Sequence, residues 1–240
     1  MNAPVFAETV RRHVTSIGYV AFVVLVALVG IFASSFNTPA ALWPSWITLL
    51  AIITGSALIG PEFSTGTLQL IVSKPIPRSV YVTSRVAGVF ASVAIAAFVG
   101  AASEIAMRLI SARSDVPWQR LGVVLGCELL ASLLVIAILT FLGSITRSYF
   151  NVAIYLGFEA GLSMLEVVLG ALRVRDNAFT ALLRQYKIEQ TLIAVDEAIF
   201  ASVPLHAIAI WAARTAVMAA VLIALACLAF QRREVPYGSE

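Results

Sequence analysis

The sequence contains little charge, few lysines and few cysteines. Only 12% of its 240 residues are charged, whereas soluble globular domains carry about 25%. By contrast, 60% of the residues are hydrophobic. This composition excludes a soluble enzyme, a disordered tail and a secreted disulfide scaffold, and it is typical of a polytopic membrane protein.

The two cysteines and the basic residues exclude further classes of protein. Cys127 and Cys227 each lie alone inside an apolar run, so we interpret them as small buried hydrophobic residues and expect no metal site or disulfide. The basic residues are scattered at the ends of apolar runs. Nucleic acid is therefore not an expected partner.

The two lysines exclude a nucleotide-binding loop. Lys74 follows Ser73, and Lys187 follows Tyr186, whereas a phosphate-binding loop requires glycine directly before its lysine. We therefore expect that this chain is not an enzyme, does not hydrolyse ATP itself and binds no cofactor.

Six long apolar runs dominate the chain. Lipid offers no hydrogen-bond partner for exposed backbone groups, so runs of this length are expected to be helices. The sequence predicts an all-α fold, with six transmembrane helices in a single domain over residues 1–240. The predicted spans are residues 14–33, 43–60, 87–110, 118–144, 149–172 and 207–230.

The aromatic residues support six spans with both termini on one side of the membrane. In that arrangement all four tryptophans fall at one interface and four tyrosines at or near the other, as aromatic belts prefer. Basic residues divide about eight against seven between the two sides, which favours cytoplasmic termini only weakly. The aromatic residues are Trp43, Trp46, Trp118 and Trp211 on one side, and Tyr19, Tyr81, Tyr149 and Tyr237 on the other.

Small residues recur at four-residue spacing in three of the predicted spans. Such residues let helix backbones approach closely in lipid, so they predict packing within one bundle or in a dimer. They are Gly88, Ser92, Ala96 and Gly100 in the third span, Gly122 and Gly126 in the fourth, and Gly157 and Gly161 in the fifth.

The segment of residues 61–81, between the second and third predicted spans, has its own pattern. Leu68, Ile71 and Val72 recur at helical spacing, and Pro75 and Pro77 end the run. The pattern predicts a short amphipathic helix at the membrane interface, followed by a rigid basic turn.

This segment resembles the corresponding part of the membrane subunit of ABC-2-type transporters. That family has an acidic residue, a Gly-Thr pair, a hydrophobic helix and then a basic-Pro-x-x-Arg turn at this place. Pro77 departs from the family pattern, in which a small hydroxyl residue is frequent there. The matching positions are Glu62, Gly66, Thr67, Leu68, Leu70, Lys74, Pro75 and Arg78.

The resemblance implies a set of partners and an orientation. Residues 61–81 would be a coupling helix segment that docks on a separate cytoplasmic ATPase, and residues 1–13 a cytoplasmic amphipathic elbow. Two ATPase copies would carry ATP and Mg, and a second permease copy, identical or related, would complete the transporter. Both termini would then be cytoplasmic, and the chain would lie among the lipids of the inner membrane.

The predicted spans contain seven charged residues, and we interpret six of them as an intramembrane polar cluster, because charge in lipid is costly and often functional. We expect Glu104 to pair with Arg108 and Glu166 with Arg214. Two interpretations stay open, namely a substrate or ion path that opens outward, and ion pairs that fix helix register. The six residues are Glu104, Arg108, Glu128, Glu159, Glu166 and Arg214.

Residues 173–206 are long for a loop and show apolar residues at roughly helical spacing. Asp176 and Asn177 suit a helix N-cap, and Pro204 breaks the chain before the last span. The segment resembles the re-entrant external helices of the same family. It is interpreted as an outer gate, a docking face for an extracytoplasmic partner, or a plain interfacial helix.

The leading hypothesis is the membrane-spanning permease subunit of an ATP-binding-cassette transporter that couples ATP hydrolysis by a separate subunit to export. The alternative keeps the architecture but passes ATPase motion to an extracytoplasmic partner. An intramembrane enzyme using Ser163 and His206 is disfavoured, because the two residues lie at different depths. The sequence does not specify a substrate.

Overall fold

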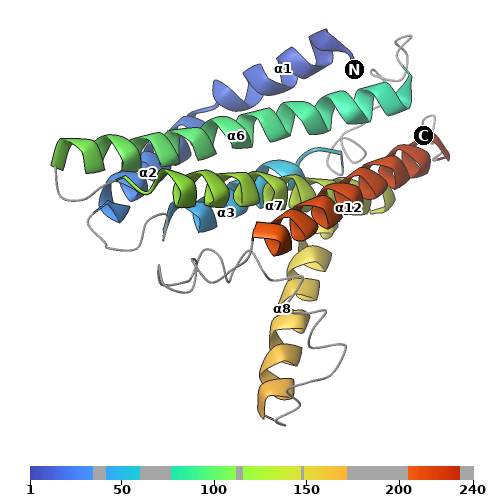
Figure 1. Ribbon diagram of the computed structural model, residues 1–240. Helices are drawn as coiled ribbons and strands as arrows, with labels where there is room; N and C mark the ends of the chain where they lie inside the picture. The colour runs from blue at the N-terminus through green and yellow to red at the C-terminus, as the bar shows by residue number, and fades with distance from the viewer. Residues whose placement is uncertain (35–41, 60–76, 112–115, 147–148, 172–204, 233–240) are drawn as a thin grey trace.

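The computed structural model describes residues 1–34, 42–59, 77–111, 116–146, 149–171 and 205–232 (Figure 1). Every regular element in these ranges is an α-helix, which confirms the all-α membrane class. The helices are α1 (Ala3–Val14), α2 (Ile17–Ala33), α3 (Trp43–Ser56), α6 (Arg78–Ser111), α7 (Trp118–Ile145), α8 (Phe150–Ala171) and α12 (Leu205–Arg232).

Each of the six predicted spans overlaps one of these helices, but the helices differ in length. Four helices, namely α6, α7, α8 and α12, are long and apolar enough to cross a membrane, and the bent pair α1 and α2 makes a fifth if it is counted as one span. Helix α3 has 14 residues, about 21 Å of helix, against a hydrocarbon core of about 30 Å. The count of six spans therefore stays a prediction.

Helix α6 lies at the centre of the bundle and packs against α1, α2, α3, α7 and α12. Its predicted small-residue face is buried along the contact with α1 and α2. A Cβ atom added to Gly88 would lie 2.7 Å from Cβ of Thr9, and one added to Gly100 would lie 2.9 Å from Cγ1 of Val26. The glycines thus let two helices approach α6 more closely than any side chain would allow.

The contact between α2 and α6 is the closest part of this packing. A Cβ atom on Gly30 would overlap the hydroxyl of Ser103 and lie 2.5 Å from the carbonyl oxygen of Gly100. Nearer the start of α2, the Tyr19 hydroxyl donates a 2.6 Å hydrogen bond to the carbonyl of Ser92. The two helices therefore run side by side in the same direction.

The small residues of α7 and α8 behave differently. Within the described residues, no atom lies within 4 Å of a Cβ added to Gly122, Gly126, Gly157 or Gly161. Helix α8 points away from the bundle (Figure 1), and its described side chains beyond Tyr155 are exposed or half-buried. The predicted packing patches of these two helices thus make no close contact in the part of the chain that the structure describes.

Helix α1 forms a bent entry to the first apolar helix, with 68° between α1 and α2. Asn2 caps α1 by accepting from the Val5 N–H, and Ser16 caps α2 by accepting from the Tyr19 N–H. The Asn2 N–H also donates to the Ser84 hydroxyl at 2.7 Å. Because the Ser16 cap lies between the two helices, the first turn of α2 has a side-chain partner at the point where the chain changes direction.

We expect Gly30→Ala to destabilise the protein, because its methyl group would meet the backbone of α6. Overpacking of this kind costs about 1–3 kcal/mol. A lower midpoint of thermal unfolding in detergent would record the loss. Gly122→Ala is the matched control, since its methyl group meets no atom within 4 Å, and equal midpoints for the two variants would contradict the α2–α6 packing.

His13, in the last turn of α1, lies half-buried against α6. Burial lowers the pKa of His13 below its ordinary 6.5, and the positive charges of Arg85 and Arg12 lower it further, whereas a hydrogen bond with the Thr9 carbonyl opposes the shift. The ring therefore prefers to be neutral, with Nδ1–H donating to Thr9 O at 2.8 Å.

The sign of this shift predicts how stability depends on pH. The unfolded chain binds the proton more readily than the folded chain, so the contribution of His13 is complete above pH 6.5 and is lost as the pH falls below it. We expect the unfolding midpoint to fall between pH 7.5 and 5.5, and to fall less in His13→Gln. An equal fall in both proteins would assign the pH dependence to other groups.

Candidate functional site

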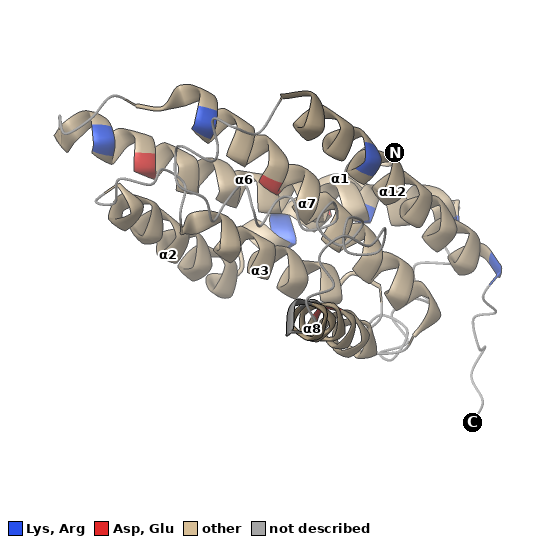
Figure 2. Cartoon of the chain, turned by 60° about the horizontal axis from the view of Figure 1, so that its bottom comes forward, with Lys and Arg blue, Asp and Glu red and all other residues tan. Residues whose placement is uncertain are grey.

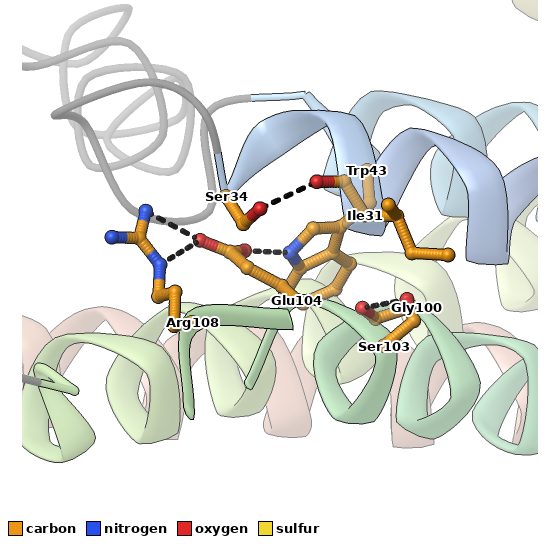
Figure 3. A network of polar contacts seen from close by, with 7 residues as sticks. All are labelled: Ile31, Ser34, Trp43, Gly100, Ser103, Glu104 and Arg108. Atoms are coloured by element: carbon orange, nitrogen blue, oxygen red, sulfur yellow. Dashed lines mark hydrogen bonds and ion pairs between the residues drawn. The ribbon is translucent and has the colours of Figure 1, made fainter. Parts of the chain in front are cut away.

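The predicted pair of Glu104 and Arg108 is present and buried (Figure 3). The Glu104 carboxylate accepts from Arg108 Nη2 at 2.9 Å and from Nε at 3.0 Å. Its second oxygen accepts from the indole N–H of Trp43 on α3 at 2.8 Å. Both oxygens of the carboxylate are therefore bonded, one within α6 and one to α3.

A second buried carboxylate holds α3 from the other side. Glu128 on α7 accepts from the Thr48 hydroxyl at 2.8 Å and from the Ser132 hydroxyl at 3.4 Å. Its side chain is 1% exposed. Helix α3 thus contacts an acidic residue of α6 through Trp43 and an acidic residue of α7 through Thr48.

Charge is confined to a few places in the described helices. Figure 2 shows the ribbon mostly without charge, and α6 carries the paired acid and base Glu104 and Arg108. Since an isolated charge in a low-dielectric interior is costly, close pairing explains why this acid and base are tolerated.

The remaining residues of the predicted polar cluster are less buried than Glu104, Arg108 and Glu128 or lie outside the described residues. Glu159 is half-buried on α8, and Arg214 is exposed on α12, where it lines an open apolar groove of about 520 Å³ with Val217, Met218 and their neighbours. The side chain of Glu166 lies outside the described residues, and so does the predicted pair of Glu166 with Arg214.

Two residues of this region were not identified from the sequence as site residues. Trp43 was predicted only as an interfacial aromatic residue, yet it is fully buried and bonded to Glu104. Arg120, near the start of the predicted span 118–144, is not among the six residues of the predicted polar cluster, yet it is 3% exposed on α7. The sequence around each of these two residues is like that around a residue at the membrane surface. Only the packing of the neighbouring helices shows that both side chains lie in the interior.

Most of the predicted coupling motif lies outside the described residues. Glu62, Gly66, Thr67, Leu68, Leu70, Lys74 and Pro75 all fall in residues 60–76. Arg78 is described, and it is the first residue of α6. Residues 78–81 of the predicted segment thus form the first turn of α6. In this turn the Pro77 carbonyl accepts from the Tyr81 N–H at 3.0 Å.

Described residues on both sides of residues 60–76 are bonded to other helices. On the α3 side, the Leu58 carbonyl accepts from Arg85 Nη2 at 3.2 Å. On the α6 side, Arg78 Nη1 donates to the carbonyls of Phe230 at 3.4 Å and Gln231 at 3.2 Å. The described residues on either side of residues 60–76 are thus tied to α6 and α12.

A family model described as ABC-2 family transporter protein matches residues 45–235. The match covers most of the chain, including α3 from residue 45 onward, both buried carboxylates and the predicted coupling segment. The chain belongs to the ABC-2 transporter family. A comparison with curated proteins gives no match.

As an ABC-2 membrane subunit, this chain is a multi-pass permease component of an ABC transporter. The family comprises membrane subunits that are not themselves the ATPase, and they work with an ATPase subunit. The sequence prediction of an ABC-2-type permease is therefore confirmed. The assigned roles of the coupling and intramembrane residues stay predictions.

We expect Glu104→Gln to destabilise the bundle, because Arg108 would keep its buried charge and lose its counter-charge. Removing one partner of a buried pair costs about 3–5 kcal/mol. The double variant Glu104→Gln/Arg108→Gln removes both charges and should recover much of the loss, as measured by denaturant titration in detergent. A single variant as stable as the natural chain would contradict a structural role for the pair.

Proposed function

We propose that this chain couples ATP hydrolysis by a separate cytoplasmic ATPase to export of a substrate across the inner membrane. Two ATPase copies carry ATP and Mg, and a second permease copy, identical or related, completes the pathway. Residues 61–81 provide the docking segment for the ATPase, with Glu62, Gly66, Thr67, Leu68, Leu70, Lys74 and Pro75 as its contacts.

The family match is the observation that carries this proposal, because its range of residues 45–235 includes the whole segment. The anchoring of the segment supports it. The chain enters residues 60–76 next to the Arg85–Leu58 bond and leaves them at Arg78, which bonds to α12. A force applied to a segment held in this way reaches α3, α6 and α12 together.

The described ends of the chain support cytoplasmic termini beside this segment. Asn2 bonds to Ser84 in the first turns of α6, and the last turn of α12 bonds to Arg78. Figure 1 shows the start of α1 and the end of α12 at the same end of the bundle. An ATPase bound at residues 61–81 would therefore face the side that carries both termini.

The buried carboxylates support a role in fixing helix register. Both oxygens of Glu104 are bonded, and Glu128 is bonded to α3 and within α7. Groups held in this way position α3 between α6 and α7. We therefore favour register over a substrate path for these two residues, while Arg214, at the edge of an open groove, remains a candidate for the path.

The proposal predicts that an ATPase co-purifies with the natural chain from detergent-solubilised native membranes. Replacing Gly66-Thr67-Leu68 with Asp-Pro-Asp should abolish this, because proline breaks the helix and two carboxylates replace its apolar contacts. The amount of ATPase per permease, measured by quantitative mass spectrometry, records the effect.

The matched control replaces Ala178-Phe179-Thr180, on the opposite predicted side of the membrane, with the same Asp-Pro-Asp sequence. It should keep its ATPase, and both variants should retain the unfolding midpoint of the natural chain. An ATPase that is absent from the natural chain, or retained after the change at residues 66–68, would refute the proposed coupling.

A further inference from the structure

The first turn of α6 and the last two turns of α12 are joined by three contacts of different kinds. Arg78 donates to the two carbonyls at the end of α12. The rings of Tyr81 and Phe230 stack, with centroids 6.4 Å apart and planes 22° apart. The Cys227 thiol lies 3.8 Å from the Ser79 carbonyl, to which it donates.

The contact of Arg78 has a clear electrostatic cause. The last four carbonyls of a helix have no partner within the helix, and together they carry the negative end of its dipole. Phe230 and Gln231 lie in this last turn of α12, which ends at Arg232. The guanidinium group of Arg78, which belongs to another helix, provides N–H donors for these carbonyls. Its positive charge also interacts favourably with the negative end of the dipole.

The contacts continue from α12 across α6 to α3. The guanidinium carbon of Arg85 lies 6.0 Å from the centroid of the Tyr81 ring, and Arg85 also donates to the Leu58 carbonyl after α3. Tyr81 and Phe230 are 6% and 3% exposed. An unbroken series of contacts therefore joins the end of α3, the start of α6 and the end of α12, on both sides of residues 60–76 in the sequence.

We propose that Arg78 is a positioning residue that couples the docking segment to the last helix, α12. The guanidinium group, with the stacked pair of Tyr81 and Phe230, makes α12 follow any displacement of the start of α6. Motion imposed at residues 61–81 is thereby delivered along the 28 residues of α12 to its far end at Leu205. This inference rests on the proposed function, since it requires an ATPase that moves the segment.

The inference assigns Arg78 a different task from the rest of the motif. In the sequence prediction Arg78 belongs with Lys74 and Pro75 as an ATPase contact, whereas the structure directs its side chain to α12. Loss of Arg78 should therefore leave the ATPase bound and weaken the transmission of its motion. Loss of the contacts at residues 66–68 should release the ATPase itself.

The test uses the purified permease–ATPase complex and hydrogen exchange of backbone amides, with and without a non-hydrolysable ATP analogue. In the natural complex, the analogue should change exchange in the outer half of α12, residues 205–218. In Arg78→Gln we expect this change to shrink about 3-fold or more, with the ATPase still co-purifying. Arg78→Lys keeps the charge and should restore part of the response.

Arg11→Gln is the matched control, because Arg11 is an exposed arginine on α1 and should leave the response of α12 unchanged. If Arg78→Gln does not assemble, Phe230→Leu removes the ring stack and gives the same comparison. A full response of α12 in an assembled Arg78→Gln or Phe230→Leu complex overturns the inference. If no ATPase is present in the natural complex, the proposed function is contradicted as well. If the natural complex shows the response of α12 and the variants show the same response, only the inference is contradicted.

Discussion

The close approach of α2 to α6 is the constraint on which the rest of the bundle depends. Lipid tails are as apolar as leucine side chains, so the hydrophobic effect does not drive helices together in a membrane. Contact must come from tight van der Waals packing and from hydrogen bonds. Gly30 and Gly100 supply the first, and the bond from Tyr19 to the Ser92 carbonyl supplies the second. With α2 fixed in this way, α6 presents its other faces to α3, α7 and α12.

Helix α3 depends on polar contacts more than its neighbours do. It is too short to span the hydrocarbon core alone, and it lies between α6 and α7, each of which offers it a buried carboxylate. Because a mispositioned α3 would leave Glu104 or Glu128 poorly bonded in a low-dielectric interior, these two residues define its register as well as its stability. The register of α3 matters for the proposed function, since α3 directly precedes the proposed docking segment in the sequence.

The described bundle divides into a tightly packed part and a helix that leaves it. Helices α1, α2, α3, α6, α7 and α12 share contacts, whereas α8 touches α7 and α3 near its start and then points away. For an ABC-2 subunit this arrangement gives the proposed ATPase motion a defined route. The series from Leu58 through Arg85 and Tyr81 to Phe230 ties three helix ends together, so the proposed docking segment would act on a connected body rather than on a single span.

The sequence by itself determined the class of the protein, its apolar helices and its family. Composition and run length decide the class and the helices, because every backbone group in lipid must be paired within its own helix, whereas the resemblance to the family rests on the motif in residues 61–81. Spacing alone predicted the small-residue face of α6 and the pair of Glu104 with Arg108, since both lie within one helix. Only the tertiary structure decided that Trp43 faces Glu104, that Thr48 faces Glu128 and that Arg78 reaches the end of α12. These contacts join residues 61, 80 and about 150 positions apart, and no local pattern records which helix faces which in the folded bundle.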